Sequence, residues 1–262
     1  MKIQCLVENV KYNNLVPKHG VCFYIETSKH KILFDLGPDD LFLRNAKLLN
    51  IDISKVDTVI ISHGHIDHGG GLRTFLSVNN TAKIYVQRNA FDDYYTKVLF
   101  IKAYIGLDQD LKNNKQIVYV DNDFVIDDEL SLWTAKKNIL PSPFNRALYK
   151  RNNLLDDFSH EQSLLVKENK NVLFTGCSHH GVFNILDAVK ERVDIQIGGF
   201  HLCNPVLKKY AKGQYLEEFK NKLKEYDNVF YTCHCTGIKP FTYLSKDNSN
   251  IKYFYCGMSL EV

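Results

Sequence analysis

Three histidines and one aspartate fall within six consecutive residues, at His63, His65, Asp67 and His68. In extended backbone, residues two apart point to the same side, so His63 and His65 can reach one metal ion. Asp67 and His68 follow a turn that Gly64 permits, and they can reach a second ion beside the first. Two such ions, about 3.5–4 Å apart, hold a water between them and lower its pKa to about 7. The spacing therefore predicts two divalent ions and a nucleophile that needs no serine or cysteine.

Histidines also follow other apolar segments of the chain. They lie at His179 and His180 after residues 171–175, at His201 after 193–197, and at His234 after 228–231. If the ends of these predicted strands lie at one edge of a pair of sheets, the histidines converge with those at 63–68. Imidazoles with one carboxylate suit Zn²⁺, Mn²⁺ and Fe²⁺ alike, and zinc is our expectation.

Short β-branched or aromatic runs predict strands along the whole chain. The expected strands are 2–7, 21–26, 31–35, 56–61, 83–87, 117–120, 130–134, 163–167, 171–175, 193–197, 228–231 and 251–255. Helical spacing predicts helices at 41–49, 72–76, 182–189 and 208–226, and a roughly helical aromatic segment at 89–104 that includes Phe100. We interpret 89–115 and 136–158 as insertions near the site. The absence of linkers and low-complexity segments makes residues 1–262 one domain in this interpretation.

Composition limits the classes of function. The net charge is +3 and the basic residues are interspersed with acidic ones, so the sequence does not favour a nucleic-acid partner. It contains no apolar run long enough to span a membrane and no signal-peptide pattern at its start. Seven cysteines without a regular framework argue against a secreted disulfide scaffold. We therefore expect a cytoplasmic protein that acts on a small molecule; its oligomeric state is left open.

The run from Ser62 to Gly70 resembles the signature of the metallo-β-lactamase superfamily, and the run from Phe34 to Gly37 resembles that family's earlier aspartate-containing strand end. The flavodiiron branch usually has glutamate in place of His65, so this branch is set aside. Three later runs, at 175–181, 198–202 and 234–237, resemble a narrower subgroup related to an archaeal dihydropterin-linked ribofuranosyl-aminobenzene-phosphate synthase. The resemblance implies an α/β fold, a four-layer αβ/βα sandwich, with a dinuclear metal site at one edge.

The resemblance also assigns ligands. It implies that His63, His65 and a third histidine bind the first metal, and that Asp67, His68 and His234 bind the second. Two histidines compete for the third position. The superfamily's usual order suggests His160, whereas the subgroup's motif suggests His179, which we favour because it follows a buried strand.

Three cysteines lie close to these predicted ligands. Cys177 stands where many relatives carry a bridging aspartate, so it is either a metal ligand or a buried thiol. Cys233 and Cys235 flank His234, and their spacing aims both away from the face that His234 uses. We expect both to be packing residues.

Other groups complete the predicted site. Asp35 is expected to orient the histidine loop by hydrogen bonds, and Glu161 to anchor a polar substrate group. His201 is expected to act as a general acid or to contact a phosphate or carbonyl group, which makes it, with Asp67, a candidate catalytic residue. His180 and His19 are interpreted as ordinary residues.

Three functions compete at this stage. The first is a dinuclear metal-dependent hydrolase of an ester, lactone, thioester or phosphodiester. The second is a transferase-like enzyme on a pterin or aminobenzoate-type phosphate. The third is a metal-dependent ligand-binding protein without catalysis. A nuclease that processes RNA is a fourth idea, which lacks the basic groove or arm that it would need.

Overall fold

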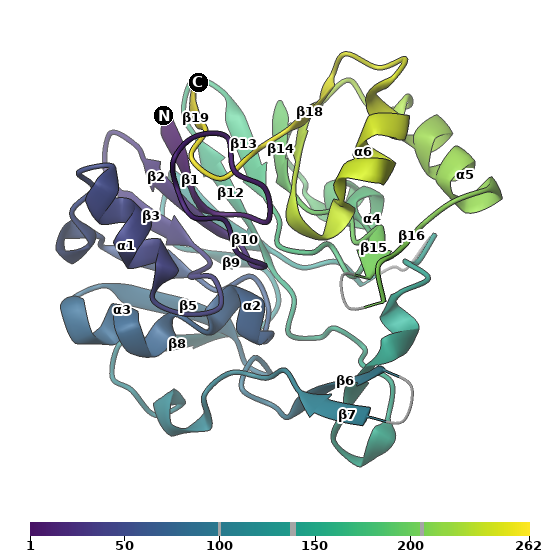
Figure 1. Ribbon diagram of the computed structural model, residues 1–262. Coiled ribbons are helices and arrows are strands. Elements are labelled where there is room, and N and C mark those ends of the chain that lie inside the picture. Colours follow the sequence, from purple (N-terminus) through teal and green to yellow (C-terminus); the bar gives the residue numbers. More distant parts are fainter. Residues whose placement is uncertain (99–100, 137–139, 205–206) are drawn as a thin grey trace.

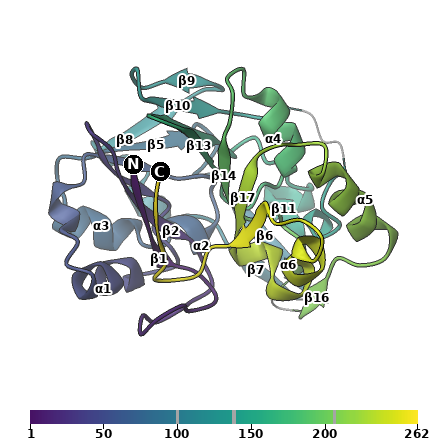
Figure 2. The same cartoon turned by 90° about the horizontal axis from the view of Figure 1, so that it is seen from above.

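Two seven-stranded sheets face each other at the centre of the molecule, and helices cover the outer face of each (Figures 1 and 2). The computed structural model describes residues 1–98, 101–136, 140–204 and 207–262. This arrangement of helices, sheet, sheet and helices is the predicted αβ/βα sandwich, so the predicted fold class is confirmed.

The first sheet is built mainly from the first half of the chain, in the order β19-β1-β2-β3-β4-β5-β8. Its strands are β1 (Lys2–Val7), β2 (Cys22–Glu26), β3 (Lys31–Phe34), β4 (Thr58–Ile60), β5 (Lys83–Gln87), β8 (Ile117–Val120) and β19 (Ser259–Glu261). Its helices are α1 (Leu41–Leu48), α2 (Ile66–Gly69) and α3 (Leu72–Val78), with short 3₁₀ turns η1 (Ile53–Lys55) and η2 (Gln109–Leu111). The C-terminal β19 pairs with β1, so the two chain ends lie side by side (Figure 1).

The second sheet has the order β18-β17-β14-β13-β12-β10-β9. Its strands are β9 (Phe124–Val125), β10 (Leu130–Trp133), β12 (Ser163–Lys167), β13 (Asn171–Phe174), β14 (Ile195–Gly198), β17 (Val229–Thr232) and β18 (Ile251–Tyr253). The strands β12 and β13 form an antiparallel hairpin, and β13, β14, β17 and β18 run parallel. Because parallel strands end at the same edge, the loops after β13, β14 and β17 meet there.

Three helices cover the outer face of this second sheet. They are α4 (Val182–Ala188), α5 (Gln214–Leu223) and α6 (Ile238–Ser245), and a 3₁₀ turn, η5 (His234–Thr236), precedes α6. Among the described residues, no helix is both long and apolar enough to cross a membrane.

Aromatic side chains join the two sheets. Phe174 lies between two phenylalanines of the other sheet, with ring centroids 6.2 Å from Phe23 and 5.8 Å from Phe34. All three are fully buried. The outer faces have separate cores, formed by residues such as Phe42 and Phe75 under α1 and α3, and by others under α4 and α5. Burial on both faces explains why the central strands read as nearly continuous apolar runs.

Two sequence predictions fail in the smaller elements. Residues 89–104 do not form a helix: β6 (Tyr94–Val98) and β7 (Ile101–Tyr104) pair antiparallel, and β11 (Leu148–Lys150) joins them as a third strand. The aromatic spacing instead places Tyr95 opposite Tyr104 across this pair, with ring centroids 5.5 Å apart. Phe100 lies outside the described residues.

The predicted helix 208–226 is shorter than expected. Residues at its start form β16 (Lys209–Tyr210), which pairs with β15 (Cys203–Asn204), and α5 begins only at Gln214. Gly213, with a φ of +62°, separates the two elements. Two further 3₁₀ turns, η3 (Asn145–Ala147) and η4 (Arg151–Asn153), lie in the segment around β11.

Candidate metal centre

The predicted histidines converge at one edge of the sandwich. The loop after β4 carries His63, His65 and His68, and the loop after β13 carries His179. The ring centroid of His63 lies 4.6 Å from that of His65, 4.1 Å from that of His68 and 5.0 Å from that of His179. His234, after β17, has its ring centroid 5.1 Å from that of His68. Ligands from both sheets therefore meet at a single place.

A glycine permits this close approach of the two sheets. A Cβ atom on Gly176, which follows β13, would lie 2.2 Å from Ser62 Oγ and 3.0 Å from His63 Nδ1. Any side chain at this position would push the end of β13 away from the histidine loop. Gly176 therefore brings the loop that carries His179 within reach of the loop that carries His63 and His65.

Four of these histidines have a buried nitrogen without a hydrogen-bond partner. They are the Nε2 atoms of His63, His65, His179 and His234. Buried polar atoms almost always have partners, and nitrogens that serve as metal ligands are one of the recognised exceptions. Ligand atoms of His63, His65 and His179 all lie within 4.8 Å of one another. This group fits one divalent ion.

Burial keeps these rings in the form that can bind a metal. Burial and the neighbouring His68 lower the pKa of His63 well below its usual value. Burial and the nearby His201 do the same to the pKa of His179, and burial also lowers the pKa of His65. A neutral imidazole offers a lone pair to a metal, which the protonated ring does not.

A second group lies next to the first. Asp67 Oδ2 is 3.2 Å from His234 Nε2 and 3.8 Å from His68 Nε2. Burial alone would raise the pKa of Asp67, but His68, His19 and His234 hold it well below its usual value. Asp67, His68 and His234, the predicted ligands of the second ion, therefore present a carboxylate and two imidazoles to one another, and this donor set also fits a divalent metal.

His179 and His160 differ in the freedom of their ring nitrogens. Nδ1 of His160 accepts a hydrogen bond from the backbone N–H of Gly64 (2.8 Å), and Nε2 lies 3.1 Å from Asp156 Oδ2. His179 uses Nδ1 for Asn145 Oδ1 (3.1 Å) and leaves Nε2 unpaired. The geometry gives His160 the role of holding the histidine loop, and it favours His179 as the third ligand of the first group.

Asp35 lies beneath both groups of ligands. It is fully buried after β3 with a φ of +59°. The backbone N–H of Ser62 donates to Oδ1 and its hydroxyl to Oδ2, both at 2.7 Å. His68 Nδ1 is 2.6 Å from the same Oδ2, and His63 Nδ1 is 2.9 Å from Ser62 Oγ. One carboxylate therefore orients His68 directly and His63 through a serine, so that each ring turns Nε2 toward the site.

The charge of Asp35 also acts on His68. Burial lowers the pKa of His68, but the carboxylates of Asp35 and Asp67 outweigh it and raise the pKa to about 9. The same hydrogen bond fixes the proton on Nδ1, because an ionised carboxylate can only accept. A pKa of about 9 means that Nε2 is also protonated at neutral pH, so a metal ion that binds His68 has to displace this second proton.

Glu161 has a different place from the predicted one. Its Oε1 accepts from the backbone N–H of His179 (2.6 Å), and its Oε2 from the backbone N–H (2.9 Å) and ring Nδ1 (3.0 Å) of His180. Both oxygens are therefore engaged within the protein, and Glu161 positions the loop that carries His179. Anchoring of a substrate group by Glu161 has no support in this geometry.

The three cysteines near His234 separate into two kinds. Cys233 is fully buried in the core between the sheets, as predicted. Cys235 is not turned away: its Sγ lies within 4.8 Å of ligand atoms of Cys177 and His234. The prediction that Cys235 is only a packing residue is therefore wrong, because the 3₁₀ turn η5 breaks the extended alternation on which it depended. Cys177 Sγ lies 3.3 Å from His68 Nε2, and burial raises the pKa of its thiol well above the usual value.

Comparisons with known proteins agree with this geometry. Residues 15–144 match the family model described as the metallo-beta-lactamase superfamily. A protein of Methanocaldococcus jannaschii named 7,8-dihydropterin-6-methyl-4-(beta-D-ribofuranosyl)-aminobenzene-5'-phosphate synthase is 30% identical, over 91% of this chain and 88% of its own length. The chain belongs to the metallo-beta-lactamase superfamily.

Two further relatives match along nearly the whole chain. The uncharacterised protein MJ0448 of the same archaeon is 28% identical, over 97% of this chain and 98% of its own. The crystal structure of Tm1679, described as a metal-dependent hydrolase of the beta-lactamase superfamily, is 29% identical with a TM-score of 0.82, over 100% of this chain and 99% of its own. The predicted resemblance to the superfamily is thus confirmed.

In this member of the superfamily a cavity of about 210 Å³ opens beside the ligands. His65, Asp67, His179 and His234 line it together with apolar side chains from both predicted insertions: Ile105, Phe144, Ala147 and Leu148. One wall of the cavity is therefore formed by residues of the two segments 89–115 and 136–158. Within these segments, residues 99–100 and 137–139 lie outside the described residues. This wall consists largely of apolar groups.

His201 also lines this cavity, where a residue expected to contact the substrate would have to lie. It is half-buried, and neither ring nitrogen has a hydrogen-bond partner in the protein. Its backbone is held at a φ of +49°, with its carbonyl accepting from the hydroxyl of Ser142 (2.5 Å) and its N–H donating to Cys235 Sγ (3.3 Å). Strained backbone fixed in this way is common at functional sites.

Sequence reasoning missed His19. Its Nε2 lies 3.2 Å from Asp67 Oδ2, and its ring centroid lies 4.5 Å from that of His234. His19, Asp67 and His234 form a further group whose ligand atoms lie within 4.8 Å. No local motif surrounds His19, because it reaches the site from the long segment between β1 and β2. Only the pairing of that segment against the loop at 63–68 reveals it.

Proposed function

We propose that this protein is a hydrolase with two divalent metal ions, assigned as zinc, that cleaves an ester, lactone or phosphodiester bond of a small molecule. The observation that carries the proposal is the group of four buried Nε2 atoms without a hydrogen-bond partner, and three of their histidines, His65, His179 and His234, line a cavity together with Asp67. Membership of the superfamily and the similarity to Tm1679 give it further support.

The protein's residues divide the work. His63, His65 and His179 would hold one ion, and Asp67, His68 and His234 the other. Ions bound there supply Lewis-acid polarisation of the scissile group and a water of lowered pKa. Asp35 and Ser62 keep the ligand rings oriented, and the apolar wall excludes bulk water from the reacting bond.

His201 has a separate role in this proposal. Its ring nitrogens are unpaired and face the cavity, so the ring can give a proton to a leaving oxygen or contact the group being cleaved. The variant His201→Gln is expected to lower kcat about a hundredfold while leaving the metal content unchanged. A loss of metal in this variant would instead make His201 a ligand.

Metal analysis and an activity panel test the proposal together. Protein purified without added metal is expected to carry two metal ions per chain by mass spectrometry and to cleave members of a panel of esters, lactones and phosphodiesters. Asp67→Ala is expected to lose about one ion and to lower the rate at least a hundredfold. His30→Gln, which removes a histidine far from the site, is the matched control and should keep both its metal content and its hydrolytic rate.

Two results would contradict the proposal. One is a single metal ion per chain that added Zn²⁺ or Mn²⁺ does not increase. The other is full activity in Asp67→Ala. A protein that binds two ions and cleaves no member of the panel would favour the metal-dependent binding protein instead.

A second candidate is a transferase-like enzyme that acts on a pterin or aminobenzoate-type phosphate. The 30% identity to the archaeal synthase favours it. Calorimetry with a pterin and with 4-aminobenzoate tests it. Absence of binding at millimolar concentration would remove this candidate.

A further inference from the structure

A second cavity, of about 820 Å³, lies beside the metal centre and is rich in lysine. We call it the lysine groove. Its lysines come from the segment around β16 and from α6, and its aromatic residues from η3, α5 and α6 and their flanks. The lysines are Lys208, Lys209, Lys212 and Lys239, and the aromatic residues are Phe144, Tyr210, Tyr215 and Tyr243.

Among the residues that the structure describes, no acidic side chain lines the groove. Within the described ranges, none of its four lysines forms an ion pair; Lys239 Nζ only lies over the ring of Tyr210, 5.1 Å from its centroid. Asp247 is paired with Lys220, whereas Glu217 accepts from the hydroxyl of Tyr243, which lines the groove, and so places one negative charge at its edge. Four lysines against this one carboxylate leave the groove with a net positive potential.

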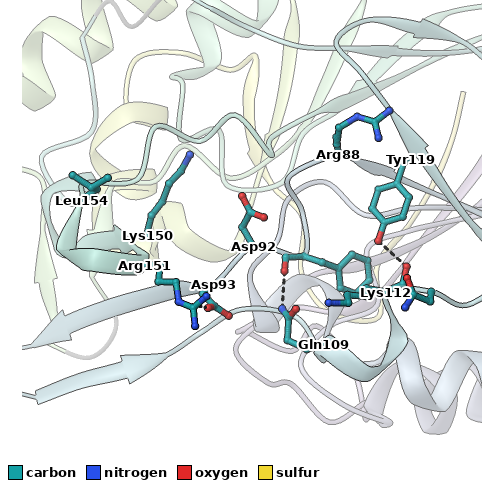
Figure 3. A pocket seen from close by; sticks show the side chains of 11 residues that line it. Arg88, Asp92, Asp93, Gln109, Lys112, Tyr119, Lys150, Arg151 and Leu154 are labelled. Carbon is teal, nitrogen blue, oxygen red and sulfur yellow. Dashed lines mark hydrogen bonds and ion pairs between the residues drawn. The ribbon is translucent and has the colours of Figure 1, made fainter.

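A third cavity shows the opposite situation. Figure 3 shows basic side chains, among them Arg88, Lys150 and Arg151, around a surface cavity of about 680 Å³. Each of these three has an acidic partner: Asp121 for Arg88 (2.5 Å), Asp157 for Lys150 (2.5 Å) and Asp93 for Arg151 (3.3 Å). These three basic residues are neutralised within the protein, whereas the described ion pairs include none of the lysines of the lysine groove.

The lysine groove adjoins the cavity at the metal centre. Phe144 lines both. The hairpin of β15 and β16 joins them as well, because Cys203 of the metal cavity pairs with Tyr210 of the groove, and Asn204 with Lys209. A ligand that extends past Phe144 would have one end at the histidines and the other among the lysines.

We propose that the lysine groove binds a phosphate group carried by the substrate, at some distance from the bond that the metal centre cleaves. This inference rests on the proposed hydrolase function. Several lysines around one groove suit a dianion better than a single carboxylate, because each adds its own attraction. The aromatic side chains offer faces on which a planar ring of the ligand can stack.

The surroundings favour a small phosphorylated molecule over RNA. The net charge of the chain is only +3, and acidic residues such as Glu217 and Glu218 flank the groove on α5. A nucleic-acid backbone that extended beyond the groove would meet these carboxylates. A single phosphate ester would meet only the lysines.

Binding of phenyl phosphate to the metal-loaded protein tests the assignment. We expect calorimetry to show that the double variant Lys209→Gln/Lys239→Gln binds it about a hundredfold more weakly than the wild type, about tenfold for each lost charge-assisted contact. Lys112→Gln, a lysine of the cavity in Figure 3, is the matched control and should bind like the wild type. Benzoate, which has the same ring and a single charge, should bind more weakly than phenyl phosphate and lose less in the double variant.

Kinetics separate this inference from the proposed function. If the protein hydrolyses an uncharged ester, the double variant should keep its kcat and KM for that ester while its KM for a phosphorylated ester rises. Equal binding of phenyl phosphate in the double variant and the wild type would overturn the groove assignment even if hydrolysis is intact, because phosphate would then be held at the metal centre. Tighter binding of single-stranded RNA than of phenyl phosphate, through the same lysines, would also overturn it. The wild type could also bind phenyl phosphate through these lysines and yet hydrolyse no ester. Loss of that binding in the double variant would then support the groove assignment and reject the proposed function.

Discussion

The carboxylate of Asp35 orients ligands of both predicted ions, so replacing it tests the logic of the whole site. In Asp35→Asn the size of the side chain is kept, but one acceptor oxygen becomes an NH₂ donor. If that NH₂ faces His68, Nδ1 must become the acceptor, and the proton moves to Nε2, where it blocks metal binding. If the amide is turned the other way, the NH₂ faces the buried N–H of Ser62, 2.7 Å away in the wild type.

Both orientations have a similar energetic cost. A buried donor without an acceptor costs about 1–3 kcal/mol. A change of this size corresponds to about a tenfold to hundredfold loss of metal affinity, which is the usual effect of removing a partner of a ligand histidine. The effect should fall mainly on the second ion, because His68 contacts Asp35 directly, whereas His63 is reached only through Ser62.

Calorimetric titration of chelator-treated protein with Zn²⁺ measures this effect, together with mass spectrometry for metals per chain. We expect two binding events in the wild type and a selective weakening of one of them in Asp35→Asn. Glu129→Gln is the matched control, because it alters another buried carboxylate, which accepts hydrogen bonds from Thr27 and Ser28 and not from a proposed ligand. Two unchanged binding events in a folded Asp35→Asn protein would refute the role given to Asp35.

Two further predictions concern stability. Phe174→Ala is expected to lower the free energy of unfolding by about 3–5 kcal/mol, because it leaves a cavity between the sheets. Phe124→Ala, at a side chain that is 40% exposed, should change it by less than about 1 kcal/mol. Urea denaturation measures both variants, and equal effects would contradict the assignment of Phe174 to the core. Burial lowers the pKa of His30, but Asp57 and Asp127, 3.0 and 2.9 Å from its ring nitrogens, outweigh this and raise it above the usual 6.5. A raised pKa in the folded state stabilises the protein below the unfolded pKa, and this contribution is lost as the pH rises through the folded pKa. His30→Gln should therefore destabilise the protein more at about pH 5.5 than at about pH 8.5, and an equal or reversed difference in urea denaturation would contradict this reasoning.

Local patterns predicted the elements whose signal is contained in a few neighbouring residues. Buried central strands such as β4 and β13 appear in the sequence as apolar runs, and the loop at 63–68 carries its ligand spacing within six residues. The prediction of a helix at residues 89–104 was wrong because an aromatic segment of that length fits both a helix and a two-stranded ribbon. The pairing of β6 with β11, from a segment about fifty residues later, decided between them.

The sequence by itself determined the superfamily, the alternation of strands and helices, and the ligands His63, His65, Asp67 and His68 that we propose for the two ions, since their chemistry depends on local spacing. Only the tertiary structure distinguished His179 from His160, because a ring nitrogen is free or engaged according to partners that lie far away in the chain. It also brought His19 to Asp67 and placed the lysines of the groove beside the metal cavity. These features arise where separate segments meet, and short-range periodicity carries no information about which segments will meet.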